Sequence, residues 1–161
     1  MILNKLKLNN KIYDIFNDTN VIARLSGRCA VGHNRYATTG ETLLRNVQPL
    51  YAELSFGGFT VAHNGNLTNA VKIRNDLIDR GAIFQCTSDT EVIIHLVALS
   101  KKKTVLERLT ESLKQIEGAY SLICFAEGRM IGVRDPYGFR PLVLGKLGDA
   151  HILASETCAL D

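Results

Sequence analysis

The stretch of residues 59–69, Phe-Thr-Val-Ala-His-Asn-Gly-Asn-Leu-Thr-Asn, constrains the fold of this chain more than any other. Its apolar start is typical of a buried strand, and a pair such as Asn64 and Gly65 most often forms the two-residue turn of a β-hairpin. The residues that follow do not resemble a second strand, because their apolar side chains recur at helical spacing up to Gly81, where a helix end favours glycine. We therefore predict a strand that enters a helix through a tight turn at Asn64 and Gly65, with Asn66 as the N-cap.

Such a turn could bind an anion. The Gly65 N–H and the Asn64 carboxamide would lie at the positive end of the helix dipole. A purely structural interpretation is equally open, because asparagine and glycine both tolerate the positive φ of a tight corner. Asn64 and Gly65 alone do not decide between an anion-binding turn and a structural corner. The other polar residues of the chain are needed for that decision.

Two further helices are predicted from capping signatures. Residues 88–91, Ser-Asp-Thr-Glu, have the Ser-x-x-Glu form of a capping box, so we expect a helix to begin at Asp89. Residues 104–107 repeat the signature, and Gly118 follows where that helix would end. Two helices are thus expected in succession.

The other elements are predicted as strands. Residues 1–28 show no sustained period and suggest a weak strand with loops. Better strand patterns occur at residues 29–32, 50–54, 119–126, 129–134, 142–146 and 152–155. The last four are expected to form an antiparallel meander. Helices grouped between two sets of strands favour an α+β fold, in a single domain over residues 1–161, over a doubly wound parallel sheet.

Composition excludes several function classes. With 46% hydrophobic and 22% charged residues, the 161-residue chain has the composition of one globular domain. Its net charge of +3 is too small and too scattered for a nucleic-acid surface. No apolar stretch is long enough to span a membrane, and the first residues interrupt their apolar run too often for a signal peptide. We expect a cytoplasmic protein with neither a nucleic-acid nor a membrane partner.

The four cysteines lie far apart and include no Cys-x-x-Cys motif. This spacing indicates neither a zinc site nor a disulfide framework. We expect no metal, and cysteines that are reduced and mostly structural, including Cys86, Cys124 and Cys158. Cys29 and His33 would lie about 13 Å apart along a strand, too far for a catalytic dyad.

Four polar positions fall at strand ends or helix starts, where side chains can converge on a ligand: Arg35, Asn64, Gly65 and Asp89. An arginine can bind a carboxylate through two parallel hydrogen bonds, and an aspartate at a helix start can hold an ammonium group. Arg35 and Asp89 together therefore suit an α-amino acid. Asn64 and Gly65 would then face its side chain, and we expect His63 to fix the turn rather than to transfer protons.

These positions lie in motifs whose order and spacing are those of a known family. The motifs are Gly-His-Asn-Arg-Tyr-Ala-Thr-Thr-Gly (32–40), Asn-Val-Gln-Pro-Leu (46–50), Ala-His-Asn-Gly-Asn-Leu (62–67) and Thr-Ser-Asp-Thr-Glu (87–91). The chain resembles the glutaminase domain of the class II glutamine amidotransferases. Within that class it is most similar to the amidophosphoribosyltransferase family of purine biosynthesis, through residues 134–142, residues 155–161 and Gln48. The resemblance extends from about Ile12 to the last residue.

The resemblance implies a four-layer αββα sandwich of the N-terminal nucleophile hydrolase type. It implies that Arg35 binds the α-carboxylate of glutamine with help from Thr38, that Asp89 binds the α-amino group, and that Asn64 and Gly65 form the oxyanion hole. In the family, the released ammonia reaches a phosphoribosyltransferase domain that uses phosphoribosyl pyrophosphate and Mg. That domain is not expected in this chain, which itself is expected to need no cofactor.

The family nucleophile is a cysteine at the mature N-terminus, whose own α-amino group acts as the base. This sequence begins Met1-Ile2 instead. We therefore expect a fragment that lacks the first strands and the nucleophile, and that is inactive alone. It could be completed by a separate cysteine-bearing segment and a phosphoribosyltransferase chain. Alternatively, it is a non-catalytic amino-acid-binding or structural remnant of a split or decayed gene. An uncovered sheet edge would favour a homo-oligomer.

Overall fold

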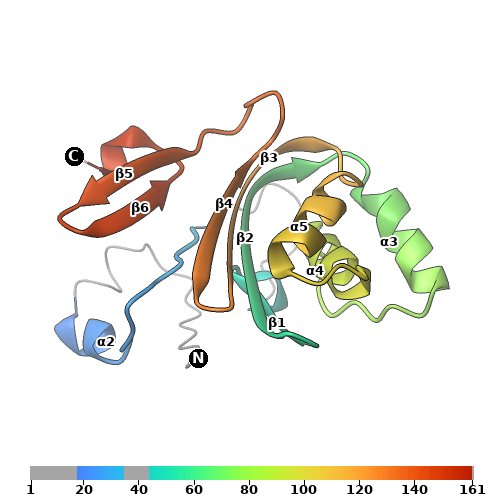
Figure 1. The fold of residues 1–161 in the computed structure, drawn as a ribbon, viewed down its shortest axis with the longest axis horizontal. Coiled ribbons are helices and arrows are strands. Elements are labelled where there is room, and N and C mark those ends of the chain that lie inside the picture. Colours follow the sequence, from blue (N-terminus) through green and yellow to red (C-terminus); the bar gives the residue numbers. More distant parts are fainter. Residues whose placement is uncertain (1–17, 35–43, 161) are drawn as a thin grey trace.

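A computed structural model describes residues 18–34 and 44–160 (Figure 1). Its helices and short 3-10 turns are α2 (Thr19–Ala23), η1 (Leu44–Asn46), α3 (Ala70–Asp79), α4 (Thr90–Leu99), α5 (Val105–Leu113) and η2 (Thr157–Ala159). Its strands are β1 (Leu50–Leu54), β2 (Gly57–Leu67), β3 (Gly118–Ala126), β4 (Arg129–Arg134), β5 (Val143–Leu147) and β6 (Ala150–Ala154).

The strands form two antiparallel sheets. One is four-stranded with the order β1-β2-β3-β4, and the other is the hairpin β5-β6. The last four strands were predicted close to where they occur, but the prediction of one continuous meander is wrong, because β5 pairs with β6 in a separate sheet. The loop that follows β4 carries the chain from the first sheet to the second.

Alternation along β2 gives the four-stranded sheet two different faces. Phe59 and Val61 are fully buried on the face that α3, α4 and α5 cover, together with Leu122 and Cys124 of β3 (Figure 1). Apolar side chains of α4, including Val92, complete this core. Burying a side chain of this size contributes about 1.5–3 kcal/mol, so the contact between the helices and the sheet supplies much of the fold's stability.

The hairpin β5-β6 packs on the opposite face of the sheet. A Cβ atom at Gly132 of β4 would lie 2.8 Å from Cδ1 of Leu153 in β6, so the two sheets meet closely at this glycine. Figure 1 shows the hairpin on the side of β4 away from the helices. The described residues therefore stack as a helix layer, a sheet and a second small sheet, which confirms the predicted α+β class.

The predicted turn at Asn64 and Gly65 is wrong. Strand β2 continues through both residues to Leu67, and its residues from Phe59 to Leu67 pair with β3. Helix α3 begins only at Ala70, with Asn69 rather than Asn66 at the N-cap. Gly65 is needed for close contact between strands instead of for a corner. Its φ is +145°, and a Cβ atom there would lie 2.0 Å from the backbone oxygen of Ala119.

The capping predictions had different outcomes. Gly81 does follow α3, with φ +89°. The capping box of α5 is confirmed, since Thr104 and Glu107 exchange both of its hydrogen bonds. However, α5 ends at Leu113, and Gly118 begins β3.

The capping box predicted at Ser88 is wrong. Helix α4 begins at Thr90 with Asp89 at the N-cap, and the Asp89 side chain makes no capping hydrogen bond. The Glu91 carboxylate accepts hydrogen bonds from the backbone N–H groups of Gln85 and Cys86 instead. Because the Glu91 carboxylate is hydrogen-bonded to the loop that precedes the helix, it cannot also form the capping box.

The described residues near the start of the chain also differ from the predictions. The prediction of a weak strand with loops over residues 1–28 lies mostly outside the described residues, but in the described part residues 19–23 form the short helix α2, which was not predicted. Asp18 caps this helix by accepting a hydrogen bond from Asn20 N. Residues 29–32 have no regular secondary structure. The argument that a strand separates Cys29 from His33 therefore fails.

Candidate functional site

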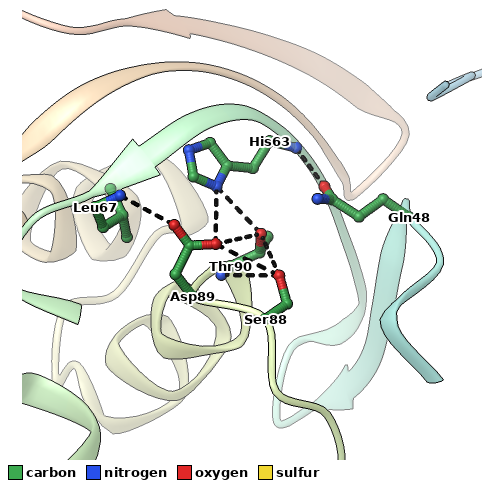
Figure 2. A network of polar contacts seen from close by, with 6 residues as sticks. All are labelled: Gln48, His63, Leu67, Ser88, Asp89 and Thr90. Carbon is green, nitrogen blue, oxygen red and sulfur yellow. Dashed lines mark hydrogen bonds and ion pairs between the residues drawn. The ribbon is translucent and has the colours of Figure 1, made fainter. Parts of the chain in front are cut away.

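Asp89 lies beside the last residues of β2, at the start of α4 (Figure 2). Its Oδ2 atom accepts a hydrogen bond from the Leu67 backbone N–H at 3.0 Å. Its Oδ1 atom lies 3.5 Å from Nδ1 of His63, and about a quarter of the side chain is exposed. The carboxylate is thus fixed from two sides and still open to a small ligand.

His63 links the strand to the helix start through a buried polar network. Its Nδ1 atom lies 3.1 Å from Oγ1 of Thr90, which accepts a hydrogen bond from the Ser88 hydroxyl at 3.0 Å. Its backbone N–H donates to Oε1 of Gln48 at 2.6 Å. Figure 2 shows the imidazole directly above Asp89 and Thr90. The geometry gives His63 a positioning task at Asp89, although not at the turn we predicted.

The Asp89 carboxyl is held in its ionised form. Burial acts to raise its pKa, but the hydrogen bond and charge of His63, together with the backbone N–H groups of Leu67 and Thr90, outweigh burial and lower the pKa below its ordinary value. A carboxylate that is charged at neutral pH and partly open is suited to an ammonium group.

Asn64 and Gly65 lie next to this carboxylate along the strand. The backbone N–H groups of His63 and Leu67 point away from β3, to Gln48 and Asp89. Because backbone directions alternate along a strand, the Gly65 N–H points to the same edge, between them. Strand β1 does not cover this edge of β2, because the last residue of β2 that pairs with β1 is Val61. Gly65 is exposed there, so its N–H can donate to a ligand.

The Asn64 side chain makes a contact that the sequence analysis did not anticipate. Its Oδ1 atom accepts a hydrogen bond of 2.6 Å from Nη2 of Arg140, 76 residues further along the chain. In the sequence, residues 134–142 and Gln48 indicate only the resemblance to the family. Nothing in local spacing indicates that Arg140 returns to β2.

The other two predicted site residues, Arg35 and Thr38, lie outside the described residues. Their contact with glutamine remains a prediction. The structure brings Asp89 to the strand segment that carries Asn64 and Gly65, and leaves the convergence with Arg35 open to experiment.

The cysteines fall into two groups. Cys86 and Cys124 are buried, and burial raises the pKa of Cys86 to about 11 and that of Cys124 to about 12. Neither thiol is activated, as expected. Cys29 and Cys158 are exposed, so the expectation of a structural role is wrong for Cys158. In the described part of the chain, no three His, Cys, Asp or Glu side chains group into a metal site.

Comparison with known proteins decides the family. A family model described as a glutamine amidotransferase domain matches residues 33–161. The chain belongs to the glutamine amidotransferase domain family. This match covers most of the chain and contains every candidate site residue named above.

Amidophosphoribosyltransferases are among the curated proteins that are similar to this chain. The chain is 49% identical over 148 residues to one from Rhizobium etli, covering 92% of this chain and 30% of that protein. It is 44% identical over 141 residues to one from Bacillus subtilis, covering 87% of this chain and 30% of that protein. The chain thus spans about 30% of the length of these relatives.

Solved structures of the family confirm the fold. The glutamine phosphoribosylpyrophosphate amidotransferase from B. subtilis, complexed with ADP and GMP, matches with a TM-score of 0.73 at 44% identity, covering 79% of this chain and 27% of that chain. A structure described as the allosteric regulatory enzyme of purine biosynthesis matches with a TM-score of 0.85 at 42% identity. The match covers 92% of this chain and 32% of that chain. The predicted N-terminal nucleophile hydrolase type of fold is therefore confirmed.

The described helices contain no stretch long and apolar enough to cross a membrane.

Proposed function

We propose that this domain binds L-glutamine and takes part in releasing ammonia from its carboxamide, as the glutaminase portion of an amidophosphoribosyltransferase-like protein. The observation that carries the proposal is the ionised, partly open Asp89 carboxylate at the strand edge that also presents Gly65. Asp89 would bind the α-ammonium group of the substrate. The Gly65 N–H and the Asn64 amide would donate to the oxygen of the side-chain carboxamide.

Hydrolysis of the carboxamide consumes water and gives glutamate and ammonia. Negative charge builds on the carboxamide oxygen when a nucleophile attacks its carbon, and fixed N–H donors stabilise that charge most in the transition state. The buried, protonated thiols of Cys86 and Cys124 are unsuited to attack. We propose that the nucleophile comes from outside the described residues, and that the whole protein passes ammonia to phosphoribosyl pyrophosphate on a phosphoribosyltransferase unit.

Calorimetric titration of the chain with L-glutamine tests the binding part of this proposal. We expect saturable binding that weakens about 10-fold or more in Asp89→Asn, because a charge-assisted hydrogen bond contributes about 1.5–3 kcal/mol. Asp76→Asn on α3 removes an exposed carboxylate elsewhere and should leave the affinity unchanged. Absence of binding to the unmutated chain, or equal affinities for Asp89→Asn and the unmutated chain, would contradict the proposal.

A non-catalytic amino-acid-binding domain is the second candidate, and it is favoured by the partly open Asp89 carboxylate, which suits an ammonium group whether or not a nucleophile is present. Both candidates bind glutamine, so the two differ only in turnover. Ammonia release should be measured for the chain alone and for the chain mixed with a cysteine-led N-terminal segment of a relative. Release in the mixture supports the glutaminase portion, whereas binding without release in either sample supports the binding domain.

A further inference from the structure

We infer that Arg140 is a positioning residue for the oxyanion site, and that its guanidinium holds the Asn64 carboxamide with the N–H₂ group turned towards the substrate. The inference rests on the proposed function, because it assigns a task to a residue that supports Asn64. It adds a third element, the loop between β4 and β5, to a site otherwise built from β2 and α4.

The chemistry of the contact fixes which way the amide faces. A guanidinium group carries only hydrogen-bond donors, so the Asn64 atom that lies 2.6 Å from Nη2 of Arg140 has to be the carbonyl oxygen. The amide nitrogen is bonded to the same carbon and points to the other side. A flip of the amide would bring two donors together, so Arg140 excludes the orientation in which Asn64 could not stabilise an oxyanion.

The loop that carries Arg140 is itself tightly held. The buried Asp135 carboxylate accepts hydrogen bonds from the backbone N–H groups of Tyr137, Phe139 and Arg140, at 3.0–3.2 Å. Arg134 donates to the backbone oxygens of Gly138 and Arg140, at 2.7 and 2.8 Å. The position of the Arg140 backbone is therefore set before its side chain reaches Asn64.

The side chain of Arg140 is committed to this one contact in the described part of the chain. Its Nε atom is buried and has no hydrogen-bond partner there. A buried donor without a partner costs free energy, so an arginine kept only for packing would be a poor choice at this position. The charged guanidinium at Oδ1 also polarises the Asn64 amide, which makes its N–H₂ group a stronger hydrogen-bond donor.

The direct test is the NMR signal of the Asn64 side-chain amide in the ¹⁵N-labelled chain, identified by its loss in Asn64→Ala. We expect Arg140→Met to shift this signal and to speed its hydrogen exchange with water. Arg140→Gln keeps a neutral donor and should therefore give an intermediate shift of this signal. It replaces Arg140→Met in the test if the methionine variant does not fold. Arg129→Met removes an exposed arginine at the start of β4 and should leave the signal unchanged.

Titration with L-glutamine shows whether the orientation matters for binding. Arg140→Met should weaken binding about 2- to 10-fold, the effect of losing one hydrogen bond to the ligand. In an Asn64→Ala background the same substitution should have no further effect, whereas a general structural role would weaken binding in both backgrounds. An Asn64 amide signal that is unchanged in either Arg140 variant, or additive losses of affinity, would overturn the inference. If the unmutated chain bound no glutamine, the proposed function would fail, and the amide signal would still decide whether Arg140 orients Asn64.

Discussion

The Asp89 carboxylate and the backbone N–H of Leu67 form a hydrogen bond of 3.0 Å that joins the start of α4 to the last residue of β2. This bond uses a backbone donor, so no change of the Leu67 side chain removes it directly. It places the proposed ammonium-binding group two residues along the strand from Gly65. The strand itself thus sets the spacing between the groups proposed to bind the two ends of the amino acid.

Asp89 should make the stability of the chain depend on pH. Its pKa is about 3.9 in the unfolded state and lower than its ordinary value in the folded state. The unfolded chain therefore binds the proton more readily. The stabilisation from this group is fully present above the unfolded pKa and is lost as the pH falls through the folded pKa.

The measurement is urea unfolding between pH 7 and pH 3, comparing the unmutated chain with Asp89→Asn. We expect the unmutated chain to be the more stable at pH 7, and the difference in free energy of unfolding to shrink as the pH drops below 4. Asp76→Asn serves as the matched control. A difference that is constant across this range would mean that Asp89 is not held in its charged form.

Gly65→Ala should destabilise the fold strongly. The new Cβ atom would lie 2.0 Å from the backbone oxygen of Ala119, and the φ of +145° is itself unfavourable for alanine. We expect a loss of at least about 2 kcal/mol in the free energy of unfolding. Gly57→Ala is the control, because Gly57 also has a positive φ, +104°, but a Cβ atom there meets nothing within 4 Å. Equal losses in the two variants would show that the close approach to Ala119 carries no cost.

These results show which parts of the structure follow from local sequence rules. The capping box of Thr104 and Glu107 was predictable because all of its partners lie within four residues. The turn at Asn64 and Gly65 was not, since local preference lost to pairing with β3, more than 50 residues away. The capping box of Ser88 and Glu91 failed for a different reason, because a competing local partner, the loop residues Gln85 and Cys86, binds the Glu91 carboxylate.

The candidate site shows the same division. The residue types at Asn64, Gly65 and Asp89 pointed to an amino-acid site through their chemistry and their family motifs. The contact of Arg140, in the loop between β4 and β5, with Asn64 of β2 spans 76 residues, so only the folded chain shows it. Arg35 and Thr38 stay predictions, because the structure does not describe them.

The two exposed thiols should react far faster than the two buried ones. The raised pKa values of Cys86 and Cys124 leave almost no thiolate at about pH 8, and burial blocks access to both side chains, whereas Cys29 and Cys158 are exposed. We expect Cys29 and Cys158 to be alkylated by iodoacetamide in the native chain, and Cys86 and Cys124 to react only after unfolding. Peptide mass spectrometry assigns the modified sites. Rapid native modification of Cys86 would contradict its assignment as an unactivated thiol and would reopen the search for the nucleophile.

Asn64→Ala should slow turnover rather than abolish binding, in any form of the protein that carries a nucleophile. The amide donates most strongly when charge has developed on the substrate oxygen, so its loss should fall mainly on kcat, by about 10²–10³-fold. KM should change much less. Asn75→Ala on α3 is the matched control, as its side chain is exposed and away from this strand edge. Steady-state ammonia release gives both constants. A change confined to KM would mean that Asn64 contacts the substrate equally in the ground state, and that the oxyanion is stabilised by other donors.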